Sequence, residues 1–227
     1  MSEETKTRIS IAAATLFCNY GHKKTTLRLI GEQVGISHVS VLRYFKSKNE
    51  LATQTVVNYI AGLEKLCYRI LEGIPRELAD IEYCRHMMWW NMHYRILSEN
   101  PIFREFYISF WGEGQTVFTH RALMPGPEAL QFIRLLSPKE DSMINGSIAT
   151  ALDATFARLI GMKAVDPAKA TKLMIVQLNK LGIDLPHLPD ENEIRDFEKK
   201  YLSKQKVDLL NDILLINYSA PSELAKE

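Results

Sequence analysis

The 227-residue chain is 46% hydrophobic and 24% charged, which suits one or two globular domains and excludes an intrinsically disordered chain. The formal net charge is only +1, and no apolar run approaches the ~20 residues that a membrane span needs. The start is polar, and the three cysteines have neither metal-like nor redox spacing. We therefore expect a cytoplasmic protein with reduced thiols and no membrane partner.

Residues 8–21 predict a first amphipathic helix. Apolar side chains recur at three- and four-residue steps from Ile9 to Tyr20, and Gly21 is expected to end the helix. This helix lies in a basic region, because residues 1–50 hold eight lysines and arginines against four acids. The remainder holds 20 basic against 23 acidic residues. A basic end on a near-neutral chain is typical of a nucleic-acid-binding module.

Residues 27–34 and 38–45 predict two short helices joined by a tight turn. Gly35 accepts the left-handed backbone that ends the first helix, and Ser37 can cap the second. Gly31 supplies a small residue where two steeply crossing helices come closest. Together these features form a helix-turn-helix arrangement. The second helix is expected to direct three apolar side chains inward: Val41, Leu42 and Phe45.

Residues 48–72 predict a long third helix after the turn. Ser47 and Glu50 have the spacing of a capping box, and Gly73 with Pro75 ends the helix. An apolar stripe begins at Leu51 and continues at helical spacing.

Three blocks in this order resemble the DNA-binding domain of the TetR family of bacterial transcriptional regulators. They read R-I-x-x-A-A-x-x-L-F-x-x-x-G, T-T-x-x-x-I-G-x-x-x-G-I-S and Y-F-K-S-K-N-E-L. The resemblance implies an all-α protein with a DNA-binding domain at residues 1–50 and a helical effector-binding and dimerisation domain at 51–227. It also implies a double-stranded DNA operator as partner, contacted by Thr26, Arg28, Ser37, His38, Val39, Ser40, Arg43, Tyr44, Lys46 and Lys48.

Within that set, each side chain type suggests a different contact. Arg28 suits a guanine edge, Val39 a thymine methyl, and Lys48 a phosphate at a helix end. Leu42 stands where the family commonly has a phosphate-contacting tyrosine, and leucine cannot donate a hydrogen bond. We expect Tyr44 or Arg43 to supply that contact.

Two further helical segments, residues 78–100 and the stretch from Pro101, concentrate the aromatic and methionine side chains. Such side chains can line an adaptable apolar pocket, although packing of a helical core explains most of them. We expect an apolar or aromatic small-molecule effector to contact Met88, Trp89, Met92, Phe106, Tyr107 and Trp111. His86 and His93 lie seven residues apart, about 10.5 Å along a helix, so they do not suit one metal ion.

Residues 138–162 and 167–181 predict two consecutive, strongly apolar helices. They suit a four-helix bundle formed with a second copy, as in TetR-like proteins, or else an internal core pair. We assign to a homodimer interface Ile148, Ala151, Ala154, Val176 and Leu178. A last helix is expected over residues 190–217, capped by Asp190 and Glu193.

The sequence thus predicts a homodimeric repressor that binds a palindromic operator and is released by an effector. The alternative is an architectural or division-related DNA-binding protein of the same fold without a small-molecule switch. No phosphate loop, His-Glu-x-x-His or nucleophile elbow is present, so we expect no enzyme activity, no cofactor and no metal.

Overall fold

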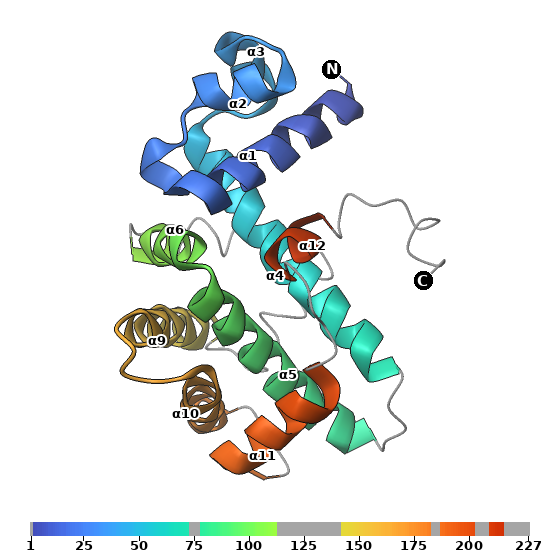
Figure 1. Ribbon diagram of the computed structural model, residues 1–227, viewed down its shortest axis with the longest axis vertical. Helices are drawn as coiled ribbons and strands as arrows, with labels where there is room; N and C mark the ends of the chain where they lie inside the picture. The colour runs from blue at the N-terminus through green and yellow to red at the C-terminus, as the bar shows by residue number, and fades with distance from the viewer. Residues whose placement is uncertain (1, 73–77, 113–141, 183–186, 203–208, 216–227) are drawn as a thin grey trace.

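The computed structural model describes residues 2–72, 78–112, 142–182, 187–202 and 209–215. Within these ranges all regular structure is helical, so the all-α prediction is confirmed (Figure 1). Three N-terminal helices form a small head, and a long helix, α4 (Lys48–Glu72), runs from the head into a larger helical body.

The head consists of α1 (Glu3–Lys24), α2 (Leu27–Val34) and α3 (His38–Tyr44). Gly35 ends α2 with φ 79°, as the sequence predicts. A methyl group at Gly31 would come within 2.6 Å of the Ile36 carbonyl oxygen, so glycine permits the tight turn between α2 and α3. The Arg8 guanidinium donates to the carbonyl of Val34 at 2.8 Å and holds the end of α2 against α1.

Two details of the head differ from the sequence-based expectation. The first helix continues to Lys24, with a break in its regular backbone at Gly21 (φ 75°, ψ 173°), because the chain resumes helical geometry after the glycine. Leu42 was expected to face inward but is 41% exposed, and Tyr20, at the end of the apolar pattern of the first helix, is 56% exposed. Val41 of α3 and Phe45, directly after it, are buried in the core, since a seven-residue helix lying on the surface buries a narrow stripe.

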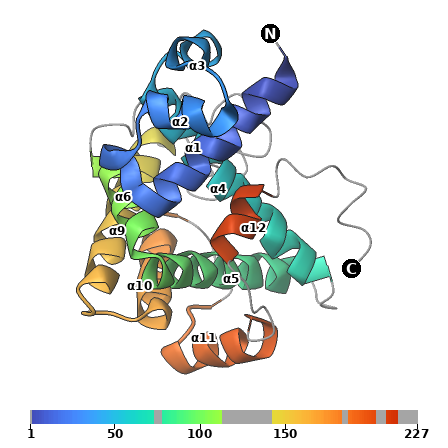
Figure 2. The same ribbon diagram turned by 45° about the horizontal axis from the view of Figure 1, so that its top comes forward.

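The body is arranged around α5 (Leu78–Glu99), which contacts α4, α9 (Ser142–Gly161) and α10 (Pro167–Lys180) (Figure 2). The helix α6 (Pro101–Gly112) packs on both α9 and α1, so it joins the body to the head. The predicted start of α4 is confirmed: the Glu50 amide donates to Ser47 Oγ, and the Glu50 carboxylate accepts from the Lys46 amide.

The C-terminal part is not the single helix that was predicted. It contains α11 (Glu191–Phe197) with a π-helical turn (Glu198–Leu202), and then α12 (Leu209–Leu215). The α11 helix packs on α10 and α5, whereas α12 packs on α4 and α1 (Figure 2). A methyl group at Gly62 would lie 2.1 Å from the Ile213 carbonyl oxygen, so α12 sits directly on the backbone of α4.

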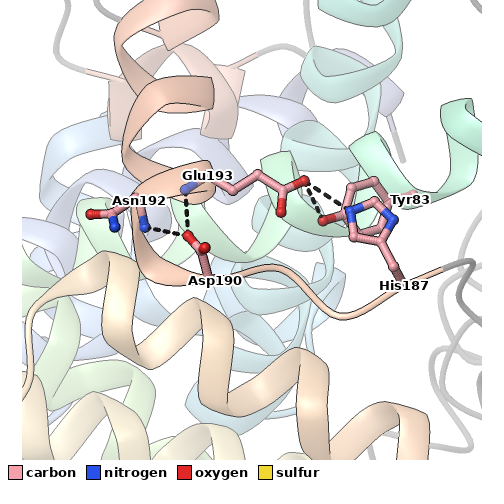
Figure 3. Close-up of polar contacts among 5 residues, drawn as sticks. All are labelled: Tyr83, His187, Asp190, Asn192 and Glu193. Atoms are coloured by element: carbon pink, nitrogen blue, oxygen red, sulfur yellow. Dashed lines mark hydrogen bonds and ion pairs between the residues drawn. The ribbon is translucent and has the colours of Figure 1, made fainter.

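Asp190 caps α11 as predicted, but Glu193 has another role (Figure 3). The Asp190 carboxylate accepts from the amides of Asn192 and Glu193. The Glu193 carboxylate instead accepts from the Tyr83 hydroxyl at 2.7 Å and lies 3.0 Å from His187 Nε2. Burial, then the Glu193 carboxylate, raises the pKa of Tyr83, which therefore remains a donor. This contact fastens α11 to α5.

Candidate functional site

The first turn of α3 presents a small exposed surface at the tip of the head (Figure 1). Ser37 caps the helix, with its Oγ accepting from the Ser40 amide at 3.1 Å. His38 and Val39 follow directly and are exposed, Val39 by 51%. Because Val41 and Phe45 fix the opposite face in the core, this turn can approach a partner without rearrangement.

The ten predicted DNA-contacting residues all lie at the surface of the head or at the start of α4. Seven are exposed: Thr26, Arg28, Ser37, His38, Val39, Arg43 and Lys46. Three are half-buried: Ser40, Tyr44 and Lys48. Thr26 also caps α2, accepting from the Leu29 amide at 3.2 Å.

Arg28 lies in the first turn of α2 and pairs with Glu32 one turn later. Its Nε donates to Glu32 Oε1 at 2.8 Å, and both side chains are largely exposed, by 82% and 54%. The hydrogen bond that Arg28 donates to Glu32, followed by the charge of that carboxylate, raises the pKa of Arg28 further, so the guanidinium stays charged. A surface pair of this kind exchanges readily for another acceptor.

Lys48 makes a contact that the sequence did not predict. Its Nζ donates to the carbonyl oxygen of His22 at 2.9 Å and ties the start of α4 to the end of α1. The ammonium group has further donors, so the tie leaves its charge available. Tyr44 packs partly against the core of the head.

The side chains predicted to bind an effector are mostly buried. Met88, Trp89, Met92 and Tyr107 are at most 3% exposed, and Trp111 is half-buried. Trp89 stacks on His93 with ring centroids 5.1 Å apart.

Phe106 belongs to a different part of the molecule from the other predicted effector residues. It stacks on Phe17 of α1, with centroids 4.9 Å apart and rings nearly parallel. Phe106 therefore lies at the junction of head and body.

A buried polar cluster in the body joins four helices, through Tyr59 of α4, His93 of α5, Tyr107 of α6 and Asp153 of α9. His93 Nδ1 lies 2.8 Å from the Tyr59 hydroxyl, and Nε2 lies 3.0 Å from Asp153 Oδ1. Tyr107 donates its hydroxyl to Asp153 Oδ2 at 2.6 Å. Burial, then the charge of Asp153, raises the pKa of Tyr59 and of Tyr107 well above the usual value, so both remain donors.

Sequence analysis did not identify this cluster. His93 was considered only as a metal ligand, and Asp153 was passed over within an apolar helix. The signal was available, because a single carboxylate in the segment TALDATF must find partners if that helix is buried. Among the residues that the structure describes, no group of three or more metal-ligating side chains gathers.

The predicted dimer residues divide into two groups. Ile148 and Ala151 are exposed on α9, Ile148 by 42%, and Val176 is half-buried on α10. Ala154 and Leu178 are buried within the chain itself.

Comparison with known families gives one match. Residues 9–55 match the family described as bacterial regulatory proteins, tetR family. The comparison with curated proteins gave no match. None of the helices in the described ranges is both long and apolar enough to cross a membrane.

Proposed function

Residues 9–55 form a helix-turn-helix DNA-binding domain of the TetR family, and from this premise we propose that the chain is a ligand-responsive transcriptional repressor. It binds a palindromic DNA operator as a homodimer, and a small apolar or aromatic effector releases it. The observation that carries this proposal is the first turn of α3, which is exposed on one face and anchored in the core on the other. That turn is suited to enter a major groove.

The path from body to head supports a ligand response. The α4 helix is continuous from Lys48, at the predicted DNA surface, to Glu72, and it carries Tyr59 into the buried polar cluster. An effector that rearranges the hydrogen bonds of Tyr107 or Asp153 would favour a different position of α4. The effector shifts the population toward the state that it binds better. The repressor is released if, in that state, the spacing of the two heads of a dimer no longer matches the spacing of the operator half-sites.

The alternative, a DNA-binding protein without a switch, has support from the packing of the body. The predicted effector side chains on α5 and α6 are buried against neighbouring rings, and Tyr107 already has a hydrogen-bond partner in Asp153. An effector in this position has to displace some of these contacts. Tryptophan emission separates the two functions, because all three tryptophans lie in the body. An effector must change that emission and operator affinity over the same concentration range.

DNA binding is tested by mapping the genomic sites and then measuring affinity for one such operator and for random DNA. Arg28→Ala is expected to weaken operator binding about five- to 150-fold and to relax preference at one base pair per half-site. Lys48→Ala is expected to weaken both DNAs and to reduce the salt slope by about one. Lys48→Arg retains the charge and serves as its control. Wild-type affinity and salt dependence in both alanine variants would refute this docking model.

Assembly is tested at the exposed positions on α9. Ile148→Arg and Ala151→Arg would each place an unpaired charge in the proposed apolar seam, which is costly. Sedimentation should show a wild-type dimer and a shift toward monomer in these variants. Leu188→Arg, at a position that is 46% exposed outside α9 and α10, is the matched control. A wild-type protein that is monomeric at micromolar concentration contradicts the proposal.

A further inference from the structure

A groove of about 500 Å³ lies between the last turn of α1 and the first two turns of α6. Here α1 of the head packs directly on α6 of the body. Figure 1 shows α6 on the side of the head away from α3, and no residue of α3 lines the groove. In the part of the chain that the structure describes, the groove borders the predicted DNA surface only at His22, whose carbonyl accepts from Lys48. Its volume is within the range of small-molecule sites, which is about 300–1,000 Å³.

Apolar side chains form much of the groove, and two of them are exposed to solvent. Tyr20 and Ile102 face it while 56% and 45% exposed, and Phe106 lies beneath them, 2% exposed. Phe106 is held by its stack on Phe17, so the floor is fixed. Exposed large apolar side chains from two helices that meet at one groove indicate a surface that an apolar or aromatic body can cover.

The charges at the groove are predominantly positive. Lys23 and Lys24 are exposed at its α1 side, and among the described residues that line the groove only Glu105 carries a carboxylate. Within the described part of the chain, neither lysine forms an ion pair. The first turn of α6 adds the partial positive charge of a helix end. Two lysines beside an aromatic wall complement a molecule with one anionic group and a flat apolar body.

We propose that this groove binds small aromatic carboxylates, at a site distinct from the interior effector position. Because the groove spans α1 and α6, a ligand in it contacts head and body together. Binding there would favour one orientation of the head, and DNA would change the affinity of the ligand by the same factor. The regulatory consequence rests on the proposed function, whereas binding of the carboxylate does not.

The test uses 2-naphthoate and its neutral counterpart 2-naphthamide, titrated calorimetrically into the full chain without DNA. Lys23→Gln/Lys24→Gln should weaken naphthoate binding about three- to ten-fold and leave naphthamide unchanged, because these charges act only on the anion. Glu105→Gln should tighten naphthoate binding about two-fold. Ile102→Ala should weaken both compounds, because it removes part of the apolar wall.

The control variant is Lys6→Gln/Lys169→Gln, which removes the same net charge at exposed positions outside the groove. It should bind naphthoate with wild-type affinity. The proposal is overturned if the wild type shows no saturable binding, or if the two double variants bind naphthoate equally. If the wild type binds naphthoate but binds no operator, the proposed function is contradicted and the proposal for the groove still holds.

Discussion

Asp153 is the residue on which the buried polar cluster depends most. Asp153 is 4% exposed, and its carboxylate contacts both His93 and Tyr107. Because both carboxylate oxygens accept, Nε2 of His93 must carry the hydrogen. In the neutral imidazole, Nδ1 then accepts from the Tyr59 hydroxyl. Removing the carboxylate therefore affects the contacts of four helices.

The loss of stability expected for Asp153→Ala follows from the hydrogen-bond donors that the substitution leaves without an acceptor. The His93 ring and the Tyr107 hydroxyl are buried, and each unpaired donor costs about 1–3 kcal/mol. We expect Asp153→Ala to lower the free energy of unfolding by about 2–6 kcal/mol, a large share of the 5–15 kcal/mol of a typical domain. Asp153→Asn keeps the shape and one acceptor, so we expect a loss of about 1–2 kcal/mol.

Urea unfolding followed by circular dichroism measures these differences, and Tyr107→Phe completes a double-mutant cycle. The cycle isolates the energy of the Asp153–Tyr107 contact from the cost of each truncation. An Asp153→Ala variant that loses less than about 1 kcal/mol would refute the reasoning, because buried donors cannot be left unpaired so cheaply. A cycle without coupling energy would refute the direct contact.

Three further outcomes test other parts of the structure. Gly62→Ala should displace α12, because the new methyl must move roughly 1 Å from the Ile213 carbonyl, and faster amide exchange in residues 209–215 would report it. Gly31→Ala should lower the free energy of unfolding by about 1–3 kcal/mol, since its methyl meets rigid backbone at 2.6 Å, and thermal unfolding would show no change if the turn adapts freely. Burial, then the nearby Arg85, lowers the pKa of His86 to about 4, so the unfolded chain binds its proton more readily. The stabilisation from neutral His86 is complete above about pH 6.5 and is lost as pH falls toward 4, by about 3 kcal/mol. His86→Leu should remove that part of the pH dependence in urea titrations.

The head could be predicted closely because its signals are local. Gly35, Ser37 and the Ser47–Glu50 pair each act within four residues, and the structure gives them the predicted roles. The inward-facing prediction for Leu42 was wrong, because helical spacing alone does not say how wide an apolar stripe a short helix buries. The TetR assignment of the domain rested on the same local blocks and is confirmed.

The body was less predictable because its specific contacts join distant parts of the chain. His93 and Asp153 are 60 residues apart, and Tyr83 and Glu193 are 110 apart. Apolar periodicity marks which face is buried but does not pair one polar side chain with another. The roles proposed for the DNA, effector and dimer residues stay predictions.

The seat of α12 on α4 has a consequence for how the chain folds during synthesis. The backbone of Gly62 lies directly against Ile213, with no room for a Cβ between them, yet the two residues are separated by 151 positions. At about 5–20 residues per second, a ribosome needs roughly 8–30 s to make that stretch. During this time α12 is not yet present to pack on α4. The part of α4 that α12 covers is therefore exposed on every nascent chain, at the stage when aggregation and chaperone capture compete with folding. Slow synthesis should favour that competition, and a segment containing residues 209–215, supplied as a separate peptide, should suppress it.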